Sequence, residues 1–293
     1  MESRRPLTRV QVAATLRQLR TVTGLPRDAA ARELRCTVSK IGDLETGRSK
    51  VKPAELERLL DLYGVTGDDR DSLVGSVRAC QVRPARNSGL ASIPTPARRY
   101  VTLEAQARSL TFYSSELLPG FLQTDTYARA VLTWSRQLTP TEVSWRLALR
   151  AERRRILARA DPPGPSCWCL LGEGALRTGV GGPGTMAGQL AYIVEQAELR
   201  PNLAIQILPF GAGVHQLMGM THTLLRFDPP AGDILHVDTH PRNVYFDNPR
   251  EVTNAAHSLE MIKLQALSRI ESLELLRRVA SSYRESSGYA AME

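Results

Sequence analysis

The stretch PRDAAARELRCTVSKIGDLETG, residues 26–47, decides the fold of the N-terminal part of the chain. It predicts a short helix over residues 26–34, opened by its proline, and then a three-residue turn. A second helix of about nine residues follows, with Thr37 as its N-cap and with Ile41 and Leu44 turned toward a core. Two short helices at this spacing are typical of a helix-turn-helix unit.

The segments on either side extend this unit to an all-α domain of five short helices over residues 1–76. Upstream, residues 9–23 place apolar side chains at i, i+4 and i+7, as an amphipathic helix does. Downstream, Pro53 opens a fourth helix that ends at Gly64, and residues 68–76 predict a short fifth helix.

The second helix of the unit is expected to contact DNA, because this helix enters the major groove with its N-terminal residues at the base edges. With Ile41 and Leu44 inward, the outward residues are Val38, Ser39, Gly42 and Asp43. Ser39 is suited to a hydrogen bond with a base edge, and Val38 to contact with a thymine methyl group. The cationic side chains placed for phosphate groups are Arg27, Lys40, Arg48, Lys50 and Lys52.

The distribution of charge supports a nucleic-acid partner. The formal net charge is +8. Residues 1–99 hold 19 Lys and Arg against 11 Asp and Glu, whereas residues 100–293 hold 19 of each kind. The whole excess therefore lies in the first third of the chain, where a local positive charge is expected of a polyanion binder. A basic segment kept for solubility is the alternative.

The composition favours a two-domain protein of the reducing cytoplasm. A chain of 293 residues exceeds one small domain, and a hydrophobic content of 42% suffices for a packed core. Four scattered cysteines make no disulfide framework. The sequence has neither an apolar run of roughly 18 residues nor the apolar segment of a signal peptide. We therefore expect a cytoplasmic, nucleoid-associated protein without membrane contact.

Residues 77–98 contain several prolines and no apolar periodicity, so they predict a linker to a second domain over residues 99–293. This second domain is expected to be of the mixed α/β (α+β) class, with regulatory and dimerisation roles. Its predicted helices span residues 99–112, 124–136, 140–160, 184–199 and 250–283, and its predicted strands span residues 167–171, 203–208, 222–227 and 234–238.

The second domain shows no constellation of catalytic residues. It lacks GxSxG and HExxH motifs, and the glycine-rich residues 179–185 lack the ending of a phosphate-binding loop. We therefore expect a domain that is not an enzyme and binds no cofactor. The alternative is an enzyme in this second domain. His236 and His240 fall at a strand end, which favours a turn over a metal site. Five arginines over residues 150–159 predict a solvated helix face, and an acidic partner or further DNA contacts are the alternatives.

Several motifs carry a resemblance to a known family. SKI-x-x-LETGR, residues 39–48, followed by LLDLYGV, residues 59–65, resembles the XRE-type (Cro/repressor-like) helix-turn-helix domain of actinobacterial regulators. YSSELLPGFLQTDTYA, residues 113–128, resembles the PG-LLQT-YA signature of the WhiJ-like, antitoxin-like regulators. The resemblance implies a bacterial transcriptional regulator, whose gene is often paired with one for a small partner protein. The chain departs from the family at Gly42-Asp43, where the family tends to have Ser-Arg.

The size of the second domain points to a regulatory role. A domain of about 190 residues is larger than is needed to position the five-helix DNA-binding domain. We therefore expect it to form a homodimer and to sense a small protein or ligand. The binding residues proposed for it are Phe121, Gln123 and Tyr127, and the alternative is that these are core residues. The alternative function is an antitoxin-like interaction module that sequesters a small partner and binds DNA weakly.

Overall fold

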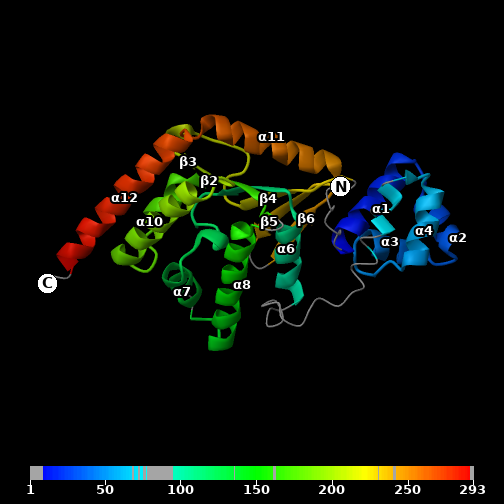
Figure 1. The fold of residues 1–293 in the computed structure, drawn as a ribbon, viewed down its shortest axis with the longest axis horizontal. Helices are drawn as coiled ribbons and strands as arrows, with labels where there is room; N and C mark the ends of the chain where they lie inside the picture. Colours follow the sequence, from blue (N-terminus) through cyan, green and yellow to red (C-terminus); the bar gives the residue numbers. More distant parts are fainter. Residues whose placement is uncertain are drawn as a thin grey trace. The chain divides into compact units, whose positions relative to one another are not determined.

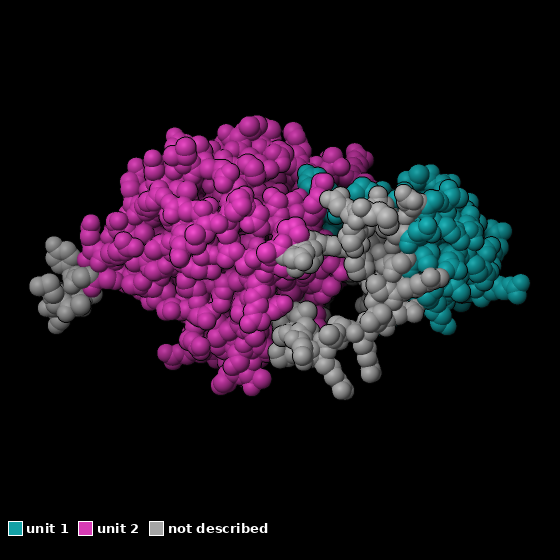
Figure 2. Space-filling model, in the orientation of Figure 1, with its two compact units in different colours: residues 1–88, 226–233 teal, residues 89–225, 234–293 magenta. Residues whose placement is uncertain are grey.

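A computed structural model describes residues 9–67, 69–71, 73–74, 77, 95–134, 136–160, 163–229, 231–239 and 242–290. The chain divides into two compact units, residues 1–88 with 226–233 and residues 89–225 with 234–293, which Figure 2 colours separately. No helix among the described residues combines the length and the apolar character needed to cross a membrane.

The first unit is helical (Figure 1). The first four predicted helices are confirmed, whereas the fifth, over residues 68–76, falls partly outside the described residues. The helices that close around the core are α1 (Arg9–Val22), α2 (Arg27–Leu34), α3 (Val38–Glu45) and α4 (Pro53–Leu62). Their most deeply buried apolar side chains are Leu16, Ala30, Ile41, Leu44, Leu56, Leu59 and Leu60.

The turn between α2 and α3 is set by local signals. Arg35 adopts a left-handed backbone conformation, with φ at 51°, and ends α2. The Thr37 hydroxyl accepts a hydrogen bond from the backbone N–H of Lys40 at 3.2 Å, which caps α3 as expected. Pro26 occupies the N-cap position of α2, one residue before the predicted place inside the helix.

The second unit is built on a six-stranded mixed sheet with the order β3-β2-β1-β4-β5-β6. Strands β1, β2 and β3 are parallel, whereas β4, β5 and β6 form an antiparallel meander. The strands are β1 (Ser109–Ser114), β2 (Ser166–Gly172), β3 (Leu203–Leu208), β4 (Thr221–Arg226), β5 (Ile234–Thr239) and β6 (Arg242–Phe246).

Helices cover both faces of this sheet. Figure 1 shows α11 along one face and α6, α8 and α10 against the other, with α12 beside α10. The helices are α6 (Thr95–Gln106), α7 (Asp125–Thr133), α8 (Pro140–Ala158), α9 (Glu173–Arg177), α10 (Pro183–Leu199), α11 (Pro249–Gln265) and α12 (Arg269–Ala290). Short 3-10 turns lie at η2 (Gly120–Leu122) and η3 (Phe210–Ala212). The mixed α and β class expected of this domain is therefore confirmed.

Strand β1 is the main correction to the predicted elements. The helix predicted over residues 99–112 ends at Gln106, and Ser109–Ser114 is a strand. Leu110 through Ser114 are all buried, because β1 lies inside the sheet with helices on both faces. Such a strand shows a continuous apolar run rather than alternation, and a run of this kind does not distinguish strand from helix. Strand β6 and helix α9 were also absent from the predicted elements.

Strands β4, β5 and β6 divide their side chains sharply between the two faces. Apolar side chains point toward α11 and pack in one cluster with it, including Leu224, Leu235, Val237 and Phe246. The alternate positions carry Thr221, Thr223, His236, Asp238 and Asn243, which line a cavity on the other face. An antiparallel sheet with one polar face commonly exposes that face to water. Here α6 and α8 cover it, and Thr223 and His236 are buried.

Candidate functional site

The outward face of α3 presents the residues expected to read bases. Val38 is 48% exposed, which is unusual for a valine, and Ser39 is exposed beside it. Gly42 is half-buried, and the space where its Cβ would stand is open. Asp43 is half-buried, and its carboxylate lies 3.8 Å from the Arg48 guanidinium.

The cations expected at phosphate groups differ in their surroundings. Arg48, Lys50 and Lys52 are exposed in the segment that joins α3 to α4. Lys40 is half-buried on α3. The Arg27 Nε donates a hydrogen bond to Glu45 at 2.8 Å, so part of this guanidinium serves the fold.

Glu45 fixes the frame that presents α3. Its side chain is 2% exposed and accepts hydrogen bonds from Arg20 on α1, at 2.5 and 3.2 Å, and from Arg27 on α2. Two cations from two helices thus converge on the last residue of α3. Burial and the charge of Glu45 also raise the pKa of the neighbouring Tyr63 to about 12. The carboxylate therefore connects α1, α2 and α3 through buried hydrogen bonds.

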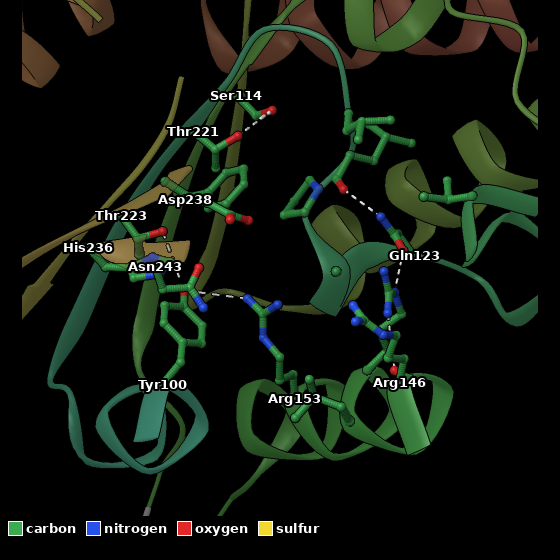
Figure 3. A pocket seen from close by; sticks show the side chains of 18 of the residues that line it. Tyr100, Ser114, Gln123, Arg146, Arg153, Thr221, Thr223, His236, Asp238 and Asn243 are labelled. Atoms are coloured by element: carbon green, nitrogen blue, oxygen red, sulfur yellow. Dashed lines mark hydrogen bonds between the residues drawn. The ribbon is translucent and has the colours of Figure 1, made fainter. Parts of the chain in front are cut away.

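The second unit contains a cavity of about 670 Å³ over the polar face of the sheet. Figure 3 shows its walls. One wall is the sheet, with side chains from β1, β4, β5 and β6, and the others are α6, α8 and the loop that leads into η2. The polar side chains that Figure 3 labels around it are Tyr100, Ser114, Gln123, Arg146, Arg153, Thr221, Thr223, His236, Asp238 and Asn243.

Three arginines of α8 face this cavity. Arg146, Arg150 and Arg153 stand at i, i+4 and i+7, so they share one side of the helix. Arg153 donates two 2.8 Å hydrogen bonds to the buried carboxylate of Glu104 on α6, and its guanidinium lies over the Tyr100 ring. These contacts correct the solvated face predicted for the arginine run, because the helical period turns part of it inward.

Arg150 has no carboxylate partner of this kind among the described ion pairs. Its Nε donates to the Gln123 side-chain oxygen at 2.6 Å, and its Nη1 donates to the Arg146 carbonyl oxygen at 3.1 Å. Burial, together with the charges of Arg153, Arg146 and Arg154, lowers the pKa of Arg150 to about 10. The Arg150 guanidinium is therefore half-buried beside the cavity with no carboxylate at hydrogen-bond distance among the described residues.

The loop into η2 is held through its own backbone. The carbonyl oxygens of Leu118, Leu122 and Gln123 accept hydrogen bonds from the side chains of Gln123, Gln189 and Arg154 respectively, at 2.6 to 2.8 Å. A Cβ at Gly120 would stand 2.8 Å from the Arg153 guanidinium. Because glycine has no side chain, the Arg153 guanidinium can pack directly against the loop at this position.

The binding residues proposed from the sequence divide between core and cavity. Phe121 and Tyr127 are 2% and 0% exposed, so they belong to the core rather than to a surface. Gln123 is also buried, but it lines the cavity and positions Arg150. The sequence pattern assigned Arg150 and Arg153 to a solvated face, and it did not point to Arg146, Tyr100 or the threonines of β4. The i, i+4, i+7 spacing on α8 was the available signal.

Among the described residues, the histidines do not gather into a metal site. Burial lowers the pKa of His236 to about 4, and its ring packs at 4.4 Å from that of Tyr100. His240 lies outside the described residues. Within the described ranges, no group of His, Cys, Asp or Glu side chains is arranged to hold a metal ion.

Comparisons with known families agree with the division of the chain into two units. Residues 11–73 match the model of a helix-turn-helix domain. Residues 97–278 match the model of a domain of unknown function, DUF5753. No curated protein and no solved structure matches the chain significantly. Because the second match alone spans more than half of the chain, the protein belongs to the DUF5753 family, and it carries a helix-turn-helix domain ahead of that domain.

Proposed function

We propose that the protein is a sequence-specific, XRE-type transcriptional regulator that acts by binding rather than by catalysis. The observation that carries this proposal is the outward face of α3. Val38 and Ser39 are exposed at the start of the helix, open space lies beside Gly42 one turn later, and exposed cations follow the helix directly. In a helix-turn-helix, these are the positions that meet base edges and phosphate groups.

We also propose that the regulator works as a homodimer. One helix-turn-helix reads only a few base pairs, whereas a twofold dimer binds two half-sites one helical turn apart. Light scattering on the full chain, with and without a duplex, measures the mass directly. A single chain per duplex at saturation would contradict this part of the proposal.

The second unit is proposed to be the sensor. It has a cavity of a size typical of small-molecule sites, lined by apolar side chains together with several polar groups whose burial is costly. A ligand that prefers the DNA-competent state would then change operator affinity by its differential binding.

Fluorescence anisotropy tests the DNA-binding proposal with a duplex from upstream of the protein's own gene and a shuffled duplex of the same composition. We expect preference for the upstream duplex. Asp43→Arg should raise affinity and alter that preference, because it removes a negative charge beside the phosphates. Asp61→Arg on α4 makes the same charge change away from this face and is the control. Equal, weak binding to both duplexes would favour the alternative, a module that sequesters a small protein partner.

A further inference from the structure

The polar face of the sheet identifies a binding site because burying it is costly. Thr223 and His236 are 1% and 6% exposed, in a position where alternation along β4 and β5 normally directs polar side chains to water. Burial of a polar group without full compensation costs on the order of 1–3 kcal/mol. Helices α6 and α8 cover this face with Tyr100 and with three arginines, alongside the apolar side chains of Trp145 and Leu149.

The charges around the cavity are unbalanced in a specific way. Glu104 compensates Arg153, and Asp125 compensates Arg154 at 2.7 Å. Arg146 and Arg150, which line the cavity together with Arg153, have no ion pair with a carboxylate among the described residues. The Arg146 Nε is buried and donates no hydrogen bond to a described atom. Two guanidinium groups thus face the cavity with donor capacity left over.

We propose that this cavity binds a small organic anion, with a carboxylate or phosphate group held between Arg146 and Arg150. Guanidinium groups match both kinds of oxyanion, which they bind through paired N–H donors. The proposal deepens the sensor role and rests on it for the effect on DNA, but binding of the anion does not depend on that role.

Gln123 fixes the orientation of the Arg150 guanidinium. It accepts the Arg150 Nε hydrogen bond, while its own amide donates to the Leu118 carbonyl oxygen at 2.8 Å. The guanidinium plane is therefore fixed before the anion arrives, and its Nη2 group has no described partner. Such preorganisation lowers the entropic cost of binding.

The wall opposite the arginines would contact the rest of the ligand, away from its carboxylate or phosphate group. Asp238 and Asn243 line the cavity from β5 and β6, and the Ser114 and Thr221 hydroxyls meet at 3.3 Å where β1 and β4 adjoin. An ionised carboxylate only accepts hydrogen bonds, so Asp238 selects a ligand with hydroxyl or amino donors. Strand β1 has its parallel partner on one side and β4 on the other, and ligands of open sheets favour this kind of switch point.

Calorimetric titration of the full chain with inorganic phosphate and with succinate tests the proposal, against sodium chloride at matched ionic strength. We expect saturable binding of at least one probe, and the stronger one identifies the oxyanion class. Arg150→Gln and Arg146→Gln should each weaken binding at least tenfold. Arg155→Gln, on the exposed side of the same helix, should bind like the wild type. Circular dichroism verifies that each variant is folded.

Absence of saturable binding for both probes, or wild-type affinity in the folded Arg150→Gln variant, overturns the proposal. The effect on DNA is read separately, by anisotropy with and without the bound probe. Binding that depends on Arg150 but leaves DNA affinity unchanged supports the anion site and contradicts the sensor role. Loss of DNA binding in every condition contradicts the regulator role and leaves the calorimetric result intact.

Discussion

The carboxylate of Glu45, at the end of α3, is bound by the guanidinium of Arg20 on α1 through two hydrogen bonds of 2.5 and 3.2 Å. Both side chains are largely buried, with exposed fractions of 2% and 14%. Removing one member of a buried pair leaves the other charge uncompensated, which destabilises a protein far more than loss of a surface pair.

Glu45→Gln is therefore expected to destabilise the first unit by about 3 kcal/mol. Glu33→Gln removes an exposed ion pair with Arg58 and should cost about 0.5 kcal/mol. Hydrogen exchange of the backbone amides of α1 to α4 measures both changes. Equal protection in the two variants would show that Glu45 does not hold the helices together.

Gly42→Ala should stabilise the first unit by about 0.5–1 kcal/mol, because alanine restricts the unfolded chain and its methyl group enters open space. Gly47→Ala should have the opposite sign, since Gly47 has a φ of 69° that L-residues rarely adopt. Urea unfolding followed by circular dichroism gives both values. A loss of stability in Gly42→Ala would mean that this face of α3 is covered.

Lys50→Ala should weaken binding to all duplexes alike and should flatten the slope of log affinity against log salt by about one unit. Lys50 is exposed beyond α3, as a phosphate contact requires. Arg284→Ala, at an exposed position of α12 in the other unit, is the matched control and should leave the slope unchanged. A changed sequence preference in Lys50→Ala would instead assign this side chain to a base.

Acid should destabilise the second unit through His236. Burial lowers its folded-state pKa to about 4, while the unfolded chain has the ordinary value of about 6.5. The unfolded state therefore binds more protons between these values, and the stability present at neutral pH is lost as the pH falls. The loss from pH 7 to pH 5 is about 2 kcal/mol for this residue.

Calorimetric unfolding of the wild type and of His236→Gln at both pH values isolates this contribution. The other titrating groups cancel in the difference between the two proteins. We expect the variant to lose about 2 kcal/mol less than the wild type on acidification. Parallel pH profiles would show that His236 is already charged in the folded protein.

Short-range signals made the first unit predictable. The Thr37 cap and the inward pair Ile41 and Leu44 lie within about two turns of one short helix, and the structure shows each of them as expected. Strand β1 was misassigned because its environment is set by β2 and β4, which are distant in sequence. Burial on both faces removes the alternation by which a strand is recognised.

The cavity could not be predicted from the sequence for a similar reason. Arg150 and Arg153 belong to a run of arginines that usually marks a solvated face. Their inward direction depends on Glu104 of α6 and on Gln123 of the loop, and no local pattern links these residues to α8. The sequence pattern around Gln123 predicted a binding role for Phe121, Gln123 and Tyr127 together. Phe121 and Tyr127 are core residues, and nothing in the pattern distinguishes them from Gln123, which faces the cavity.

The loop before α7 is specified by its surroundings more than by its own side chains. Three of its carbonyl oxygens depend on the amide of Gln123, the amide of Gln189 and the guanidinium of Arg154. A graft of the loop alone into another scaffold would therefore lose its shape, because the carbonyl groups of Leu122 and Gln123 would lose their donors. A transplant that includes α8 and the Gln189 turn of α10 carries the donors with it. The smallest transferable part is thus a loop with two helices.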